Sequence, residues 1–180
     1  MNAFSRDLKI AAVSDPVTNE TVVYRANPDY SLGKVLWKFP KWFRSRFYVS
    51  NDGKNIVAQE QYLPLDAGND SVLLTFIREG KVIREITVKQ LLGSRSKLRQ
   101  TIPRYTFGSS PPPSRPVDLG EIKTLTPIES DAHLLSWGQG LYGIDDNGFA
   151  FVDSFTGFFI FEAATGKCVF PPNNPIDEGQ

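Results

Sequence analysis

Histidine, cysteine and methionine each occur only once in this chain of 180 residues. The single cysteine, Cys168, cannot form an internal disulfide, and one cysteine with one histidine cannot supply a structural zinc site. No glycine-rich phosphate loop and no Gly-x-Ser-x-Gly nucleophile elbow is present. No apolar run reaches the roughly 18 residues of a transmembrane helix, so we expect no membrane span. These absences predict a protein with no metal site and no cofactor.

The remaining composition is that of an ordinary globular domain, with 41% hydrophobic and 22% charged residues. We expect one β-rich domain over residues 1–170, followed by a flexible polar tail at 171–180. The first residues lack the basic start and apolar stretch of a signal peptide. The compartment stays open: cytoplasmic, or periplasmic or exported if a leader has been trimmed. The sequence also leaves the oligomeric state open.

Charge is distributed unevenly along the chain although the formal net charge is zero. Residues 1–116 hold 18 Lys and Arg against 10 Asp and Glu, which gives +8, and residues 117–180 hold 2 against 10, which gives −8. Two oppositely charged portions of one domain attract each other in the folded state. The alternative is a basic face for an anionic partner.

The stretch Arg46–Leu92 is the one around which the chain is organised. It contains four apolar, β-branched or aromatic runs, separated by turn residues. The turns are typical of hairpins, because glycine accepts the positive φ that a tight primed turn needs. This stretch therefore predicts a four-stranded antiparallel meander, with strands at Phe47–Ser50, Asn55–Gln59, Val72–Ile77 and Val82–Thr87.

Similar strand signals occur on both sides of this meander. Val88–Leu92 predicts one helical turn that ends at Gly93. Residues 93–120 form an irregular excursion whose three consecutive prolines favour an extended polyproline segment. The other strand candidates are Leu8–Val13, Thr21–Arg25, Lys34–Phe39, Arg104–Phe107, Glu121–Thr126, His133–Trp137, Gly140–Ile144, Phe149–Asp153, Gly157–Glu162 and Lys167–Phe170.

An internal repeat supports this meander pattern. Apolar strands lead into turns ending in Gly-Lys at Gly33, Gly80 and Gly166, spaced 47 and 86 residues apart, and 86 is twice 43. A second set of turns precedes them, at Ser14-Asp15, at residues 50–53 and at residues 145–148. Four short strands every 40–47 residues is the spacing of β-propeller blades.

Two segments resemble the strand-turn motifs of uncharacterised bacterial β-propeller-blade-like repeat proteins, namely Ser50-Asn51-Asp52-Gly53-Lys54 and Ala164-Thr165-Gly166-Lys167. The resemblance covers about half of the chain. It implies an all-β fold of repeated four-stranded antiparallel meanders. A β-sandwich is the alternative, because the same meanders can pack as two facing sheets.

One segment interleaves aromatic and cationic residues and is the candidate binding surface. Six aromatics and four cations occur within residues 37–48. Such interleaving can bind single-stranded nucleic acid. The simpler interpretation is a strand whose alternation buries Trp37 and Phe39 while Lys38 points to water. With this interpretation, and with no net positive charge on the chain, nucleic acid is an unlikely partner. The candidate binding residues are Trp37, Lys38, Lys41, Trp42, Phe43, Arg44 and Arg46.

Catalytic signals are weak in this sequence. His133 with Asp131 is the one arrangement that a hydrolase could use, although Ser130–His133 is also typical of a turn. Asp145, Asp146 and Asn147 carry oxygen ligands of the kind calcium takes, but they lack the spacing of an EF-hand loop and suit a tight turn.

We therefore interpret the sequence as a non-enzymatic binding or interaction module. It would recognise a protein partner or a small anionic or sugar ligand through loops at one end of its sheets, and an immunity protein that blocks a toxin is one such role. A hydrolase using His133 is the alternative. Fold alone does not decide between them.

Overall fold

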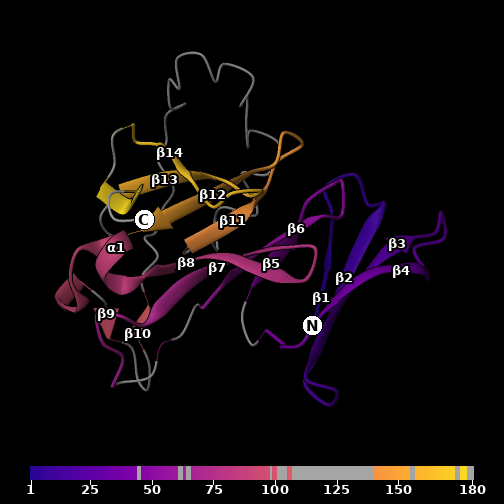
Figure 1. Ribbon diagram of the computed structural model, residues 1–180, viewed down its shortest axis with the longest axis horizontal. Coiled ribbons are helices and arrows are strands. Elements are labelled where there is room, and N and C mark those ends of the chain that lie inside the picture. Colours follow the sequence, from indigo (N-terminus) through magenta and orange to yellow (C-terminus); the bar gives the residue numbers. More distant parts are fainter. Residues whose placement is uncertain are drawn as a thin grey trace.

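The computed structural model describes residues 1–43, 46–60, 63, 66–97, 99–100, 105–106, 140–154, 157–172 and 175–177. These residues confirm the all-β class and the repeated four-stranded antiparallel meanders (Figure 1). Each meander has the strand order of its sequence, so each strand pairs with its neighbour along the chain.

Three four-stranded sheets follow one another. The first sheet contains β1 (Asn2–Phe4), β2 (Ile10–Asp15), β3 (Glu20–Ala26) and β4 (Leu32–Phe39). The central sheet contains β5 (Phe47–Val49), β6 (Asn55–Gln59), β7 (Val72–Arg78) and β8 (Lys81–Thr87). The last sheet contains β11 (Gly140–Ile144), β12 (Phe149–Ser154), β13 (Gly157–Glu162) and β14 (Cys168–Phe170).

Few other elements occur in the described part of the chain. The helix α1 (Val88–Leu92) follows β8, and the short strands β9 (Arg99–Gln100) and β10 (Tyr105–Thr106) pair with each other. Two 3-10 turns, η1 (Arg95–Lys97) and η3 (Pro175–Asp177), complete the elements. None of the described helices has the length and apolar character needed to cross a bilayer.

The other two sheets pack on opposite faces of the central sheet, so that its strand β6 is buried on both sides while much of β8 stays exposed (Figure 1). One core joins the central sheet to the first sheet, and its members include Ile10, Val23 and Ile56. The other core joins it to the last sheet, and its members include Phe76 and Phe161. Every residue of β6 is buried for this reason. The stretch around which the sequence is organised is therefore the middle layer of the molecule.

The first hairpin turns of the first two sheets are copies of each other, 45 residues apart. Ser5 and Ser50 each accept a backbone N–H on the hydroxyl at 3.0 Å and donate that hydroxyl to the aspartate two residues later, at 2.7 and 2.5 Å. The carboxylate of Asp7 or Asp52 then accepts a backbone N–H at 3.1 or 2.9 Å. The sequence predicted the first of these repeated turns at Ser14-Asp15. That prediction is wrong, because both residues belong to β2.

The predicted Gly-Lys turns are confirmed at two of the three glycines. Gly80 and Gly166 have φ of 82° and 72° and lie in turns that join paired strands. Gly33 lies inside β4 instead, beyond the turn in which Tyr30 takes the positive φ. A side chain at Gly33 would meet the carbonyl oxygen of Arg25 at 2.7 Å, so a close approach of two backbones favours glycine there.

The predicted helical turn is confirmed as α1. Thr87 and Gln90 form a reciprocal capping box at its start, and Gly93 ends it in the left-handed conformation with φ of 78°. The predicted strand at residues 104–107 is present as β10, two residues long. The strand candidates at 121–126 and 133–137 lie outside the described residues, as does most of the predicted 93–120 excursion.

Candidate interaction surface

Each sheet carries one in-register row of four side chains next to its first turn, which we call its leading row. In the central sheet the row runs across β5 to β8, through Val49, Ile56, Ile77 and Val82. Its first three members lie in the core shared with the first sheet. In the last sheet, all four members lie in the core shared with the central sheet, namely Ile144, Ala150, Phe161 and Cys168. In both sheets the leading row therefore packs on the preceding sheet.

The first sheet has the same row but no sheet precedes it in the described part of the chain. Its leading row is Phe4, Ala11, Tyr24 and Val35, one residue from each of β1 to β4. Phe4 is 40% exposed, whereas the corresponding Val49 of the central sheet is 2% exposed, and Tyr24 is half-buried where the corresponding Ile77 is 0% exposed. Ala11 is buried, and Val35 and its counterpart Val82 are exposed alike, at 44% and 47%. The row of the first sheet is thus less covered than the equivalent row of the central sheet at Phe4 and Tyr24.

The neighbouring positions extend this row into an apolar face, which we call the outer face of the first sheet. Alternation along each strand places Val13, Val22 and Ala26 on the same side as the leading row. Leu32, which pairs with Ala26, is 48% exposed. Seven of the nine exposed large apolar side chains among the described residues belong to residues 1–39. Three of these seven lie in strands of the first sheet and on its outer face, namely Phe4, Leu32 and Val35, and the other four lie in turns or at the start of the chain.

A polar contact at the sheet ends holds the three sheets together. Asn51, in the first turn of the central sheet, accepts the backbone N–H of Asp7 on its side-chain oxygen at 3.1 Å. Its side-chain nitrogen donates to a carboxylate oxygen of Asp146 at 2.7 Å. One asparagine thus connects the equivalent turns of all three sheets, and β5 lies beside both β1 and β11.

The aromatic residues of the predicted binding segment lie between the first and central sheets. Phe43 is 7% exposed, and its ring stacks on Phe39 with centroids 5.7 Å apart and lies tilted against Phe47 with centroids 5.5 Å apart. Trp37 packs against the same core and donates its indole N–H to the carbonyl of Gly53 at 2.6 Å. Trp42 is half-buried. The predicted alternation is confirmed for Phe39, which is buried, and for Lys38, which is exposed, whereas Trp37 is only partly buried. Phe43 and Trp37 thus pack between the two sheets.

The described cations of this segment, Lys38, Lys41 and Arg46, each make a contact of their own. Lys38 is exposed and forms an ion pair with Glu20 at 3.2 Å. Lys41 is exposed, and its carbonyl accepts the hydroxyl of Thr21. Arg46 is half-buried, and its carbonyl accepts the amide of Gln59 at 2.8 Å. Arg44 lies outside the described residues.

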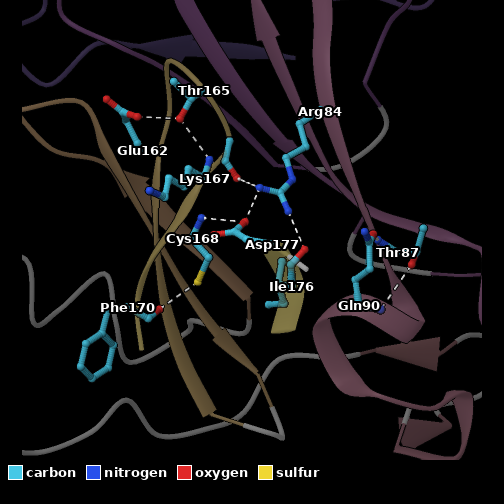
Figure 2. A network of polar contacts seen from close by, with 11 residues as sticks. Arg84, Thr87, Gln90, Glu162, Thr165, Lys167, Cys168, Phe170, Ile176 and Asp177 are labelled. Carbon is cyan, nitrogen blue, oxygen red and sulfur yellow. Dashed lines mark hydrogen bonds and ion pairs between the residues drawn. The ribbon is translucent and has the colours of Figure 1, made fainter. Parts of the chain in front are cut away.

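A buried arginine ties the end of the described chain to the sheets (Figure 2). Arg84 donates to the carbonyls of Gly166 and Ile176 at 2.9 and 2.7 Å and forms an ion pair with Asp177 at 2.5 Å. Ile176 itself is buried in the core of the central and last sheets. Within the stretch expected to be a flexible tail, η3 is therefore firmly anchored.

The single thiol lies beside this network and is unsuited to nucleophilic chemistry. Burial, together with the negative charge of Asp177, raises the pKa of Cys168 to about 11. Its thiol donates to the carbonyl of Phe170 at 3.2 Å. A thiol with this pKa is almost wholly protonated at neutral pH, and the thiolate is the reactive form.

The acidic turn at residues 145–148 has a structural explanation. Asp145 accepts the backbone N–H groups of Asn147 and Phe149 at 3.0 and 2.7 Å, so its carboxylate completes the turn. Burial raises its pKa, and the nearby Asp146 adds to that rise. No group of three or more metal-ligating side chains occurs among the described residues. The hydrolase pair, His133 and Asp131, lies outside them.

The outer face was not among the predicted binding residues, although a signal for it is present in the sequence. Every residue at positions 10–13 of β2 and 22–24 of β3 is apolar, so both faces of these strands carry apolar side chains. Apolar residues at consecutive positions are typical of strands that are covered on both faces, as β6 is. The first sheet has this pattern but is covered on one face only.

These features define an all-β protein of stacked four-stranded meanders with one uncovered apolar sheet face. No protein-family model, curated protein or solved structure matches the chain.

Proposed function

We propose that this protein is a non-enzymatic interaction module made of propeller-blade-like sheets, which binds a protein partner through the outer face of the first sheet. The observation that supports the proposal is the group of exposed apolar side chains on this face, namely Phe4, Leu32 and Val35, with Tyr24 half-buried in the same leading row. A contiguous exposed apolar patch on a folded domain marks an interaction site more often than scattered apolar residues do.

The stacking of the sheets supports a blade-like interpretation. In both internal interfaces the leading row of one sheet packs on the other face of the preceding sheet. The first strands, β1, β5 and β11, lie next to one another, and their turns meet at Asn51. Successive blades of a propeller are arranged in this way. A sandwich of two facing sheets does not require three equivalent leading rows.

The free energy available at this face is sufficient for recognition. Burying one large apolar side chain that was exposed contributes roughly 1.5–3 kcal/mol. Four such side chains, Phe4, Tyr24, Leu32 and Val35, lie on the outer face at least partly exposed. Association also has an entropic cost of several kcal/mol, so a face of this size favours micromolar rather than nanomolar binding.

The test compares two valines at equivalent positions of the repeat. Val35 and Val82 both end a leading row, and they are 44% and 47% exposed, but only Val35 lies on the outer face. Immobilised wild-type protein, Val35→Glu and Val82→Glu are each exposed to an extract of the source cells. We expect one protein to be captured by wild type and by Val82→Glu but not by Val35→Glu. In purified form, this protein should bind wild type and Val82→Glu with similar affinity and Val35→Glu much more weakly. Equal capture by all three would refute the proposal.

A further inference from the structure

The outer face of the first sheet is shaped to pack on another β-sheet. The two equivalent faces within the chain each bury their leading row against a neighbouring sheet of the same four-stranded type. The positions correspond residue by residue, since the pair Phe4 and Ala11 has the same place beside its turn as Val49 and Ile56. The chemistry that fits this face is therefore a flat apolar sheet rather than a charged peptide or a polar small molecule.

The charges on this face lie at one end of it. Asp15, Glu20 and Lys38 are on the same side as the leading row, at the end away from Leu32, and Lys38 forms an ion pair with Glu20 at 3.2 Å. The leading row itself contains no charge. The formal net charge of the whole chain is also zero, so two copies do not repel each other at long range. Near-neutral net charge promotes association between copies.

Symmetry decides which face of a second copy is available. Within the chain, a leading row packs on the opposite face of the preceding sheet. In the last sheet that opposite face carries Phe151 and Ile160, which are 7% and 0% exposed, and Phe149 and Phe158, which are half-buried. The outer face of the first sheet offers more exposed apolar surface, because Phe4, Leu32 and Val35 are each at least 40% exposed. A twofold axis brings this face onto itself and requires no second patch.

We propose that two copies of this chain associate through the outer faces of their first sheets, as a twofold-symmetric, face-to-face packing of two β-sheets. This inference rests on the proposed function, because it uses the same face and names its occupant. The contact is expected to be weak, since a standard stable interface buries about 800 Å² per partner and one four-stranded sheet face is smaller than that.

Sedimentation velocity of the purified chain tests this proposal, with loading concentrations from about 1 to 200 µM, the range in which weak interfaces dissociate. We expect a monomer–dimer equilibrium for wild type, at least a tenfold weaker dimer for Val35→Glu, and an unchanged dimer for Val82→Glu. Phe4→Glu gives a second variant on the same face. Circular dichroism and urea unfolding confirm that each variant is folded.

Three results would overturn the inference. They are a wild-type chain that stays monomeric over the whole range, a dimer that Val35→Glu leaves intact, and a dimer that Val82→Glu disrupts equally. A monomeric chain whose capture of another protein still depends on Val35 would overturn the twofold dimer and leave the proposed function standing. A chain that neither dimerises nor captures a protein in a Val35-dependent way would refute both the dimer and the proposed function.

Discussion

Removal of the Asp177 carboxylate should destabilise the protein through the buried guanidinium that it faces. The side chain of Arg84 is 4% exposed, and its three partners are the carbonyls of Gly166 and Ile176 and the carboxylate of Asp177. Without the carboxylate, the positive charge stays buried with only neutral acceptors. Removal of one partner of a buried pair costs about 3–5 kcal/mol. Asp177 is 27% exposed, so water reaches the vacated site and the lower end of that range applies.

We therefore expect Asp177→Ala to lower the free energy of unfolding by about 3 kcal/mol. The matched control is Glu20→Ala, which removes the carboxylate from the exposed pair with Lys38. An exposed pair of this kind is worth at most about 1 kcal/mol. The two variants remove one carboxylate each, so the difference between them isolates the effect of burial.

Urea unfolding, followed by circular dichroism and tryptophan fluorescence, measures both losses. With an m-value of about 2 kcal/mol/M, a loss of about 3 kcal/mol lowers the midpoint by about 1.5 M. The loss in Asp177→Ala should persist in about 0.5 M salt, because buried charges are screened weakly, whereas any effect of Glu20→Ala should shrink. The reasoning is refuted if Asp177→Ala costs no more than Glu20→Ala, or if its effect disappears in salt.

Three further predictions follow from the turns and the thiol. Gly80 and Gly148 both have φ above 80°, but a side chain at Gly80 would meet a backbone carbonyl at 2.5 Å and one at Gly148 meets nothing within 4 Å. In urea unfolding, Gly148→Ala should cost about 1–2 kcal/mol for the left-handed backbone, and Gly80→Ala clearly more. Asn51→Asp replaces a donor to Asp146 with a like charge, so at neutral pH it should cost about 1–2 kcal/mol, and less in high salt. Burial raises the pKa of Cys168 from 9.0 to about 11, so its labelling by a thiol reagent at pH 8 should be about a hundredfold slower in the native protein than in urea.

Each of these has an outcome that contradicts it. Equal costs for the two glycine variants would mean that the backbone near Gly80 shifts without penalty. A salt-independent loss in Asn51→Asp would show that repulsion from Asp146 is not its cause. Rapid labelling of native Cys168 would show that the thiol is neither buried nor protonated as described.

The hairpins could be predicted from the sequence because their causes are local. Asp52 and Gly53 specify a turn through a carboxylate that caps backbone N–H groups and a residue that tolerates positive φ. Alternating apolar residues then define the strands on either side. Gly33 was misinterpreted because a glycine required for close backbone approach and a glycine required for a turn are indistinguishable in sequence. The aromatic segment near Phe43 was ambiguous for a similar reason, since an aromatic residue suits both a core and a binding surface.

The antiparallel meanders and their order follow from the amino-acid sequence, as does the two-sided apolar character of β2, β3 and β6, because these depend on neighbours within a few residues. Which apolar faces are covered depends instead on how the sheets pack. Ile56 and Ala11 hold equivalent positions in the repeat, and both belong to apolar rows. The row of Ile56 packs on the first sheet, whereas the row of Ala11 leaves Phe4 40% exposed although Ala11 itself is buried. Burial depends on what lies across the face, and that partner is remote in sequence.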